Sequence, residues 1–211
     1  GSEMCIRDSV YSGSDKLSIE SVNAAAAATF VVYPDGNLTD EEAQKYINES
    51  GIKDIVDRAA SKVYVARPAN GISFTDDDVI GFETIVGKIG VSNNFKLIGI
   101  GDGATFINQN LTSYMNFVSG LALINPAQGQ EVKVSVPTYL VTDDQAVINS
   151  YVKANNAGKV KDGYYENPES HYEIVVVNSD TKTSAADATK DAWNTVLEKF
   201  HQGRQSLGTF S

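Results

Sequence analysis

Cysteine and tryptophan each occur once in this sequence of 211 residues, and histidine occurs twice. The single cysteine, Cys5, lies in the opening GSEMCIRDS, which has no periodicity and resembles a cloning scar or adapter read-through. We set residues 1–9 aside as an artefact or tag. The rest of the chain then has no cysteine, which excludes an internal disulfide and leaves the redox compartment open. No apolar run approaches the roughly 20 residues of a membrane-spanning helix, so such a helix is excluded.

Positive charge is also in the minority, with 17 lysines and arginines against 27 aspartates and glutamates, a net charge of -10. Nucleic acids and anionic lipids repel such a surface, so we expect neither a nucleic-acid partner nor a membrane partner. The composition, 42% hydrophobic and 21% charged, is typical of a globular domain that can bury a core without disulfides or metal. The length predicts one domain, at 10–201, followed by a tail or linker at 202–211.

Predicted strands and helices alternate along nearly the whole chain. Six short apolar runs are predicted to be strands: 29–33, 62–66, 95–100, 120–124, 137–141 and 172–177. Four helices are predicted to begin at capping boxes: Thr39 with Glu42, Thr75 with Asp78, Thr142 with Gln145 and Ser184 with Asp187. This alternation predicts the α/β class, a three-layer, mostly parallel sheet with helices on both faces. The polar stretch 155–169 is predicted to be a long surface loop.

A glycine-rich turn joins the predicted strand at 95–100 to a helix. One motif that fits this context is the dinucleotide fingerprint G-x-G-x-x-G/A, matched by Gly99, Gly101 and Ala104. That fingerprint also needs an acidic residue about 20 positions on, at the end of the next strand. The next strand ends at Asn125 and Pro126 instead. We therefore expect no dinucleotide cofactor, and no other cofactor is indicated.

The second motif that fits is the nucleophile elbow, G-x-S-x-G, in which a strand turns sharply into a helix. Small residues are needed two positions either side of the nucleophile, because the turn is tight. Gly99 and Gly103 satisfy that requirement around Gly101. Moving the frame by one residue would make Asp102 the nucleophile, but it would put Ile100 where a small residue is required. The pattern thus predicts an elbow whose nucleophile position is occupied by a glycine.

From this point the chain resembles an α/β-hydrolase from its third strand onward, in the branch of polyhydroxybutyrate depolymerases and feruloyl-type carbohydrate esterases. The resemblance covers roughly 29–201 and rests mainly on the order of the elements. Segment 97–106 resembles the strand, elbow and helix of that branch, and 120–125 resembles the strand that follows. Segment 136–144 resembles the strand that delivers the triad acid, and 184–200 resembles the closing helix.

Carried over residue by residue, the resemblance leaves the catalytic positions incomplete. The serine position holds Gly101, and the acid position holds Asp143 or Asp144. The histidine belongs in the loop 178–183, which contains none. The two histidines of the chain, His171 and His201, lie before the last strand and after the closing helix. Losing the nucleophile and the base together typically costs about a millionfold in turnover.

Other acidic residues have both a functional and a structural interpretation. Asp102 is either a relocated nucleophile or ligand-binding acid, or an acid favoured by the helix dipole; we favour the dipole. Asp143 and Asp144 are either a vestigial triad acid or part of the first turn of a capped helix, which we also favour. The turn containing Asp35 and Gly36 lies where hydrolases place oxyanion donors, but Pro-Asp-Gly is an ordinary turn sequence.

The acidic run at 76–78 superficially resembles a metal cluster. It follows a capping threonine at a predicted helix start, where carboxylates are favourable without an ion. We therefore expect no metal site.

The sequence predicts a catalytically degenerate hydrolase-like domain, a structural or binding module of a larger esterase- or depolymerase-like protein. Its expected partner is a second hydrolase domain of the same parent chain, or a second copy of itself, and its expected location is secreted or at a bacterial cell surface. One alternative is an active carboxylic ester hydrolase that uses Asp102. The other is a small-molecule binding module at a crevice formed by Asp35, Gly36, Gly101, Asp102 and Asp144. We also expect an exposed sheet edge, because the first antiparallel strands of the hydrolase pattern are missing.

Overall fold

The structure is a computed structural model that describes residues 6–12, 28–58, 61–89, 94–128, 135–170 and 172–200. His171, His201 and the expected tail at 202–211 lie outside the described residues. Within them, no helix is both long enough and apolar enough to cross a membrane.

The described residues form one nine-stranded sheet, in the order β1-β3-β2-β4-β5-β6-β9-β8-β7. In chain order the strands are Ile6–Ser12 (β1), Thr29–Tyr33 (β2), Lys62–Ala66 (β3), Phe95–Ile100 (β4), Val118–Ile124 (β5), Thr138–Val141 (β6), Gly158–Lys161 (β7), Tyr164–Glu166 (β8) and Ile174–Asn178 (β9). The six strands from β3 to β9 in that order are parallel. Antiparallel strands flank them: β1 beside β3, and the β8–β7 hairpin beside β9.

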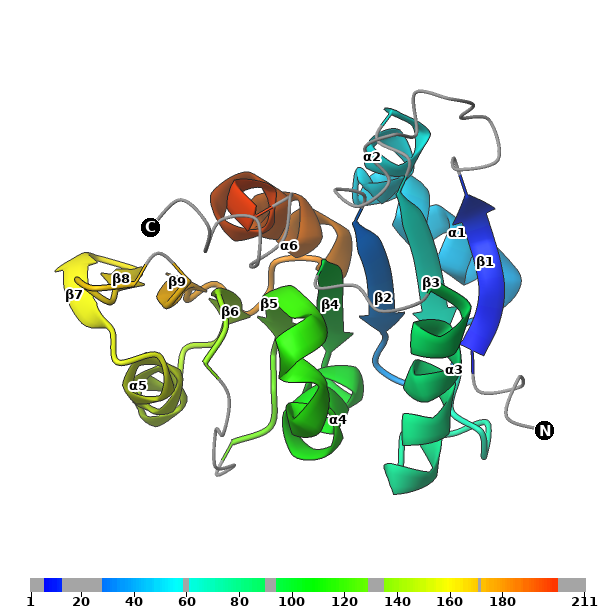
Figure 1. The fold of residues 1–211 in the computed structure, drawn as a ribbon, viewed down its shortest axis with the longest axis horizontal. Helices are drawn as coiled ribbons and strands as arrows, with labels where there is room; N and C mark the ends of the chain where they lie inside the picture. The colour runs from blue at the N-terminus through cyan, green and yellow to red at the C-terminus, as the bar shows by residue number, and fades with distance from the viewer. Residues whose placement is uncertain are drawn as a thin grey trace.

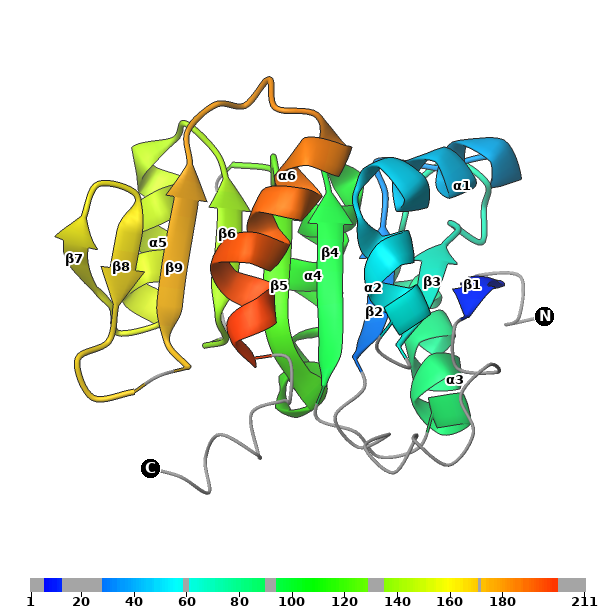
Figure 2. The same ribbon diagram turned by 90° about the horizontal axis from the view of Figure 1, so that it is seen from above.

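Helices cover both faces of this sheet, as Figure 1 shows. They are Asp40–Glu49 (α1), Ile52–Arg58 (α2), Val79–Ile89 (α3), Asp102–Asn110 (α4), Gln145–Ala154 (α5) and Ala185–Ala192 (α6). Helices α1, α2 and α6 lie on one face, and α3, α4 and α5 on the other (Figures 1 and 2). Helix α6 continues as a π-helical turn, Trp193–Leu197, and a 3-10 turn, Glu198–Phe200; further 3-10 turns are Asp76–Asp78 and Thr112–Phe117.

The core consists of two apolar layers separated by the sheet. Strand β2 contributes to both, because its side chains alternate between the faces: Val31 and Tyr33 point to the α3–α4 layer, and Phe30 and Val32 to the α1–α2–α6 layer. All five residues of β2 and all seven of β5 are buried, as expected of strands covered on both faces. The predicted three-layer α/β architecture is confirmed.

Two predictions at the edges of the sheet were wrong. The stretch 155–169 forms the β7–β8 hairpin rather than a structureless loop, because Asn156 and Gly163 adopt positive φ and turn the chain. All four residues of its edge strand β7 are exposed, and two of them are lysines, which explains its polar, loop-like sequence. At the opposite edge β1 pairs with β3, so the expected absence of an antiparallel strand there is not observed. This strand includes residues 6–9, which the sequence analysis set aside.

The helix starts follow the predicted caps with one exception. The full capping boxes form at Thr39 and Thr75, and Ser184 caps α6 by accepting from the Asp187 N–H. Thr142 is not the cap of α5, because Asp144 holds that position and accepts from the N–H groups of Ala146 and Val147. A carboxylate two residues closer to the helix takes the place that the Thr142 pattern indicated.

Candidate functional site at the carboxyl ends of β2 and β4

Strands β2 and β4 are neighbours, and the connections that follow them pass to opposite faces of the sheet. The chain after β2 leads to α1 and α2 on one face, and the chain after β4 leads to α4 on the other. Such a topological switch point opens a crevice at the carboxyl ends of the strands, where parallel α/β proteins bind their ligands. The glycine-rich turn and the Pro-Asp-Gly turn therefore meet at the position where this architecture places a site.

The glycine-rich turn is as tight as the elbow pattern requires. Strand β4 ends at Ile100, α4 begins at Asp102, and Gly101 joins them with φ 53° and ψ -114°. A Cβ at Gly103 would lie 1.8 Å from the Tyr33 carbonyl oxygen, and one at Gly99 would lie 2.5 Å from the Ala104 Cα. Both clashes are with backbone, which cannot move aside. Only glycine fits at these two flanking positions.

The carboxylate of Asp35 lies against Gly101. A Cβ on Gly101 would be 2.5 Å from the Asp35 Cγ, so this carboxylate stands where the side chain of an elbow nucleophile would begin. Asp35 Oδ1 also accepts a 2.9 Å hydrogen bond from the Asp102 N–H. In α/β-hydrolases the N–H of the residue after the nucleophile is an oxyanion donor. Here that donor is engaged by an anion of the chain itself.

The neighbouring loop residue Gly36 is part of the same turn. Its N–H donates to the Pro34 carbonyl at 3.0 Å, and its φ of 99° is the left-handed conformation that glycine adopts readily. This N–H belongs to the loop from which hydrolases take their second oxyanion donor, and it closes the turn instead. The interpretation of this segment as a Pro-Asp-Gly turn agrees with the geometry.

Asp102 is engaged through its side chain as well as through its backbone. Its Oδ2 accepts a 2.8 Å hydrogen bond from the Phe74 N–H, which ties the start of α4 to the loop before α3. Phe74 in turn packs against Tyr33 and Phe106, with ring centroids 5.3 and 5.5 Å away. The carboxylate therefore braces a loop, in addition to its favourable position in the first turn of a helix.

The remaining acidic candidates have structural partners. Asp144 caps α5 and forms its hydrogen bonds with that helix rather than with Asp35, Gly101 or Asp102. Asp143 is exposed beside it. In the 76–78 run, Asp78 is buried and accepts from the N–H groups of Ala69 and Thr75, so it closes a loop. Among the described residues, no three histidine, cysteine or acidic side chains are grouped in a way that could hold a metal.

The loop that would carry a catalytic histidine folds on itself. Asn178 accepts from the Asp180 N–H at 3.0 Å and donates to Thr183 Oγ1 at 3.2 Å. The Asn125 amide at the end of β5 donates to the Thr181 carbonyl at 3.2 Å, which docks the loop against the sheet. The amides and hydroxyls of this loop cannot act as a general base at neutral pH, and the Asp180 carboxylate accepts from the Lys182 N–H.

A buried lysine at the opposite ends of the strands was missed by sequence reasoning. Lys96 is fully buried on β4, and its Nζ donates to Ser119 Oγ at 2.7 Å, which donates to Asn94 Oδ1 at 2.8 Å. Burial lowers the pKa of Lys96 to about 7. The sequence signal was a charged residue within an otherwise continuous apolar run, Phe-Lys-Leu-Ile.

No known family model matches the sequence, and no curated protein matches it significantly. Solved structures do match its fold. One is a phospholipase/carboxylesterase from Dyadobacter fermentans, with 14% identity, a TM-score of 0.51, and coverage of 82% of this chain and 91% of that one. Another is a carboxylesterase from Mesorhizobium loti, with 12% identity, a TM-score of 0.50, and coverage of 87% and 92%. The fold is that of the α/β-hydrolases.

Proposed function

We propose that this chain is a catalytically degenerate α/β-hydrolase-like domain that acts as a structural or binding module of a larger esterase- or depolymerase-like protein. The observation that carries the proposal is the state of the elbow. Gly101 supplies no nucleophile, and the Asp35 carboxylate engages the Asp102 N–H on which an oxyanion would depend. An ester carbonyl at this point would meet a negative charge instead of a donor, which disfavours the anionic transition state of acyl transfer.

The purified chain should not hydrolyse p-nitrophenyl acetate or p-nitrophenyl butyrate above the buffer rate. The measurement is initial velocity at saturating ester for the wild type, with Asp102→Asn as the matched variant. A turnover of roughly 1 per second or more would overturn the proposal. If Asp102→Asn abolished that turnover, the competing function would be an ester hydrolase that uses Asp102.

A module of this kind needs a partner, which we propose to be a second hydrolase domain or a second copy of the chain. Of its large apolar side chains, Ile72, Ile80 and Val160 are strongly exposed, and Ile72 belongs to the loop beside Gly36. We expect the isolated chain, at a concentration on the order of 50 µM, to self-associate in sedimentation experiments or to bind a hydrophobic dye. A clean monomer that binds no dye would count against this part of the proposal.

A further inference from the structure

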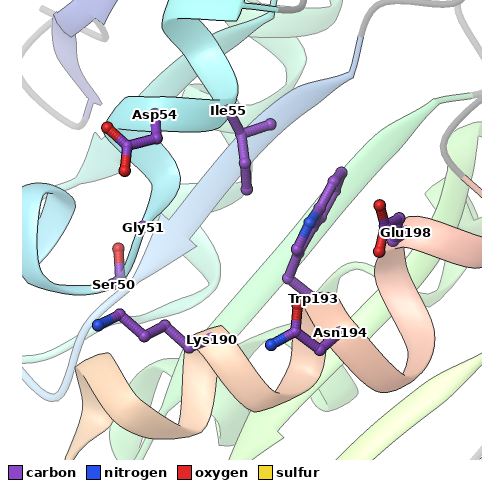
Figure 3. A pocket seen from close by; sticks show the side chains of 8 residues that line it. All are labelled: Ser50, Gly51, Asp54, Ile55, Lys190, Trp193, Asn194 and Glu198. Carbon is purple, nitrogen blue, oxygen red and sulfur yellow. The ribbon is translucent and has the colours of Figure 1, made fainter.

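A hollow of about 260 Å³ lies between α2 and the end of α6, on the face of the sheet that these helices cover. Trp193 and Ile55 are its large apolar side chains, and Asp54, Lys190, Asn194 and Glu198 also line it. In Figure 3, Asp54 and Lys190 lie on one side of the indole and Glu198 on the other. None of the candidate residues at the elbow lines it. The volume is slightly below the range that suits drug-sized ligands, so the hollow suits one small ring.

Unusual backbone features lie on both sides of the hollow. On one side, Gly51 links α1 to α2 with φ 83°, and a Cβ there would come within 3.7 Å of the Lys190 side chain. On the other side, the helix loosens into the π-helical turn that begins at Trp193. Such turns are rare and are found frequently at functional sites. The Trp193 ring packs near Phe30, with centroids 6.0 Å apart, and is partly buried against the core.

The polar groups of α6 and its π turn fall into two sets. Those that face neighbouring elements are hydrogen-bonded: Thr189 to Tyr46 at 2.6 Å, and Asp191 to Tyr139 at 2.5 Å. The polar side chains that line the hollow are not hydrogen-bonded. Among the described residues, no hydrogen bond or ion pair joins the side chains of Asp54, Lys190, Asn194 or Glu198 to another residue. Four exposed polar side chains that line the hollow are therefore available to a ligand.

The chemistry of these four side chains restricts the class of ligand that can bind. The two carboxylates disfavour an anion. All three charged side chains are exposed, so water and salt screen the small negative excess and a cation gains little from it. We therefore infer a neutral ligand. The carboxylates accept hydrogen bonds, the ammonium donates them, and the Asn194 amide does both, so the ligand should carry groups that also do both. Hydroxyl groups have that property. The indole face is electron-rich and suits the C–H groups on one face of a saturated ring.

We propose that this hollow is a binding site for a neutral saccharide, with a pyranose ring against Trp193 and hydroxyls bonded to polar side chains that line the hollow, among them Asp54 and Asn194. The site is separate from the elbow, so it stands whether or not the domain hydrolyses esters. It gives the domain a binding activity that does not depend on the triad positions.

The test uses the intrinsic fluorescence of Trp193, which is the one tryptophan in the chain and so reports on this site alone. The full chain is titrated with D-glucose, D-xylose, cellobiose and xylobiose, and with tetramethylammonium chloride and sodium benzoate as charged probes. We expect a saturable change with at least one saccharide and none with the charged probes. Calorimetry with the same saccharide supplies a readout that does not depend on the indole.

Variants connect the signal to the proposed contacts. Asp54→Asn and Asn194→Ala should each weaken saccharide binding by about fivefold or more, and Trp193→Ala should abolish the calorimetric signal. Asp57→Asn is the matched control, because Asp57 lies on α2 but does not line the hollow. Saccharide binding by this variant should be unchanged. Circular dichroism confirms that each variant is folded. If Trp193→Ala does not fold, the Asp54 and Asn194 variants decide the result.

Three results would overturn the proposal. The first is the absence of saturable binding for every saccharide tested, by both fluorescence and calorimetry. The second is tighter binding of tetramethylammonium or benzoate than of any saccharide, which would make this a site for a charged ligand. The third is saccharide binding that Asp54→Asn and Asn194→Ala leave unchanged. None of these outcomes bears on ester hydrolysis.

Discussion

The elbow and the hollow differ in how their polar groups are used. At the elbow, the Asp102 N–H, the Asp102 carboxylate and the Gly36 N–H are all bonded within the chain, to Asp35, Phe74 and Pro34. At the hollow, the side chains of Asp54, Lys190, Asn194 and Glu198 form no hydrogen bond or ion pair with another described residue. The tight geometry of the elbow turn therefore does not by itself indicate unoccupied polar groups. Polar groups that already have partners stabilise the fold, and those without partners can bind a ligand.

The largest effect should come from the backbone clash at the elbow. We expect Gly103→Ala to cost more than about 4 kcal/mol or to prevent folding, because its Cβ would lie 1.8 Å from the Tyr33 oxygen. Urea denaturation measures the loss. Gly87→Ala is the control: nothing lies within 4 Å of its Cβ on α3, so alanine there should stabilise the helix by up to about 1 kcal/mol. Equal stability of the two variants would remove the steric basis of the elbow assignment.

Lys96→Met, at the other end of β4, should stabilise the domain in a pH-dependent way. The folded protein releases the Lys96 proton near pH 7, whereas the unfolded chain holds it to about pH 10.5, so between these values the unfolded chain binds more protons. Wild-type stability from this group therefore rises with pH from about 7 to 10.5. The gain from methionine should be on the order of 3–5 kcal/mol at pH 7 and should shrink toward pH 10.

The measurement is urea unfolding at several pH values for Lys96→Met and for the exposed-lysine control Lys153→Met. The control should change stability little at any pH. A gain from Lys96→Met that is independent of pH between 7 and 10 would show that Lys96 keeps its proton in the fold over this range, so that burial does not lower its pKa.

Gly101→Ser should destabilise the domain by about 1–3 kcal/mol without creating an esterase, because serine would have to adopt φ 53°, ψ -114° beside the Asp35 carboxylate. Asp35→Gly removes that carboxylate, so the serine should cost less in the double variant, with a coupling of about 1 kcal/mol. Unfolding of the four proteins of this cycle measures the coupling. Additive costs would mean that Asp35 does not compete for the nucleophile position, and ester turnover in Gly101→Ser would mean that a base is within reach.

The smallest effects should separate the two regions by function. Asp102→Ala should cost about 1 kcal/mol, since it removes the acceptor of the Phe74 N–H. Asp54→Ala should change the free energy of unfolding by less than about 0.5 kcal/mol, because the side chain is exposed and has no bond to lose. Thermal unfolding compares them directly. A larger cost for Asp54→Ala would mean that the hollow serves the fold rather than a ligand.

The sequence by itself determined the parallel core. Apolar runs such as 29–33 and 95–100 predict buried strands, and capping threonines such as Thr39 predict helix starts, because both act within a few residues of the chain. It also indicated the elbow, since a glycine pattern records steric limits directly. Only the tertiary structure decided what fills that elbow, because Asp35 and Asp102 are 67 residues apart and meet through the crossover from β2 to β4. The β7–β8 hairpin escaped prediction because exposed edge strands lack an apolar face. The hollow escaped it because Asp54 and Trp193 come together only when α2 and α6 pack on the same face of the sheet.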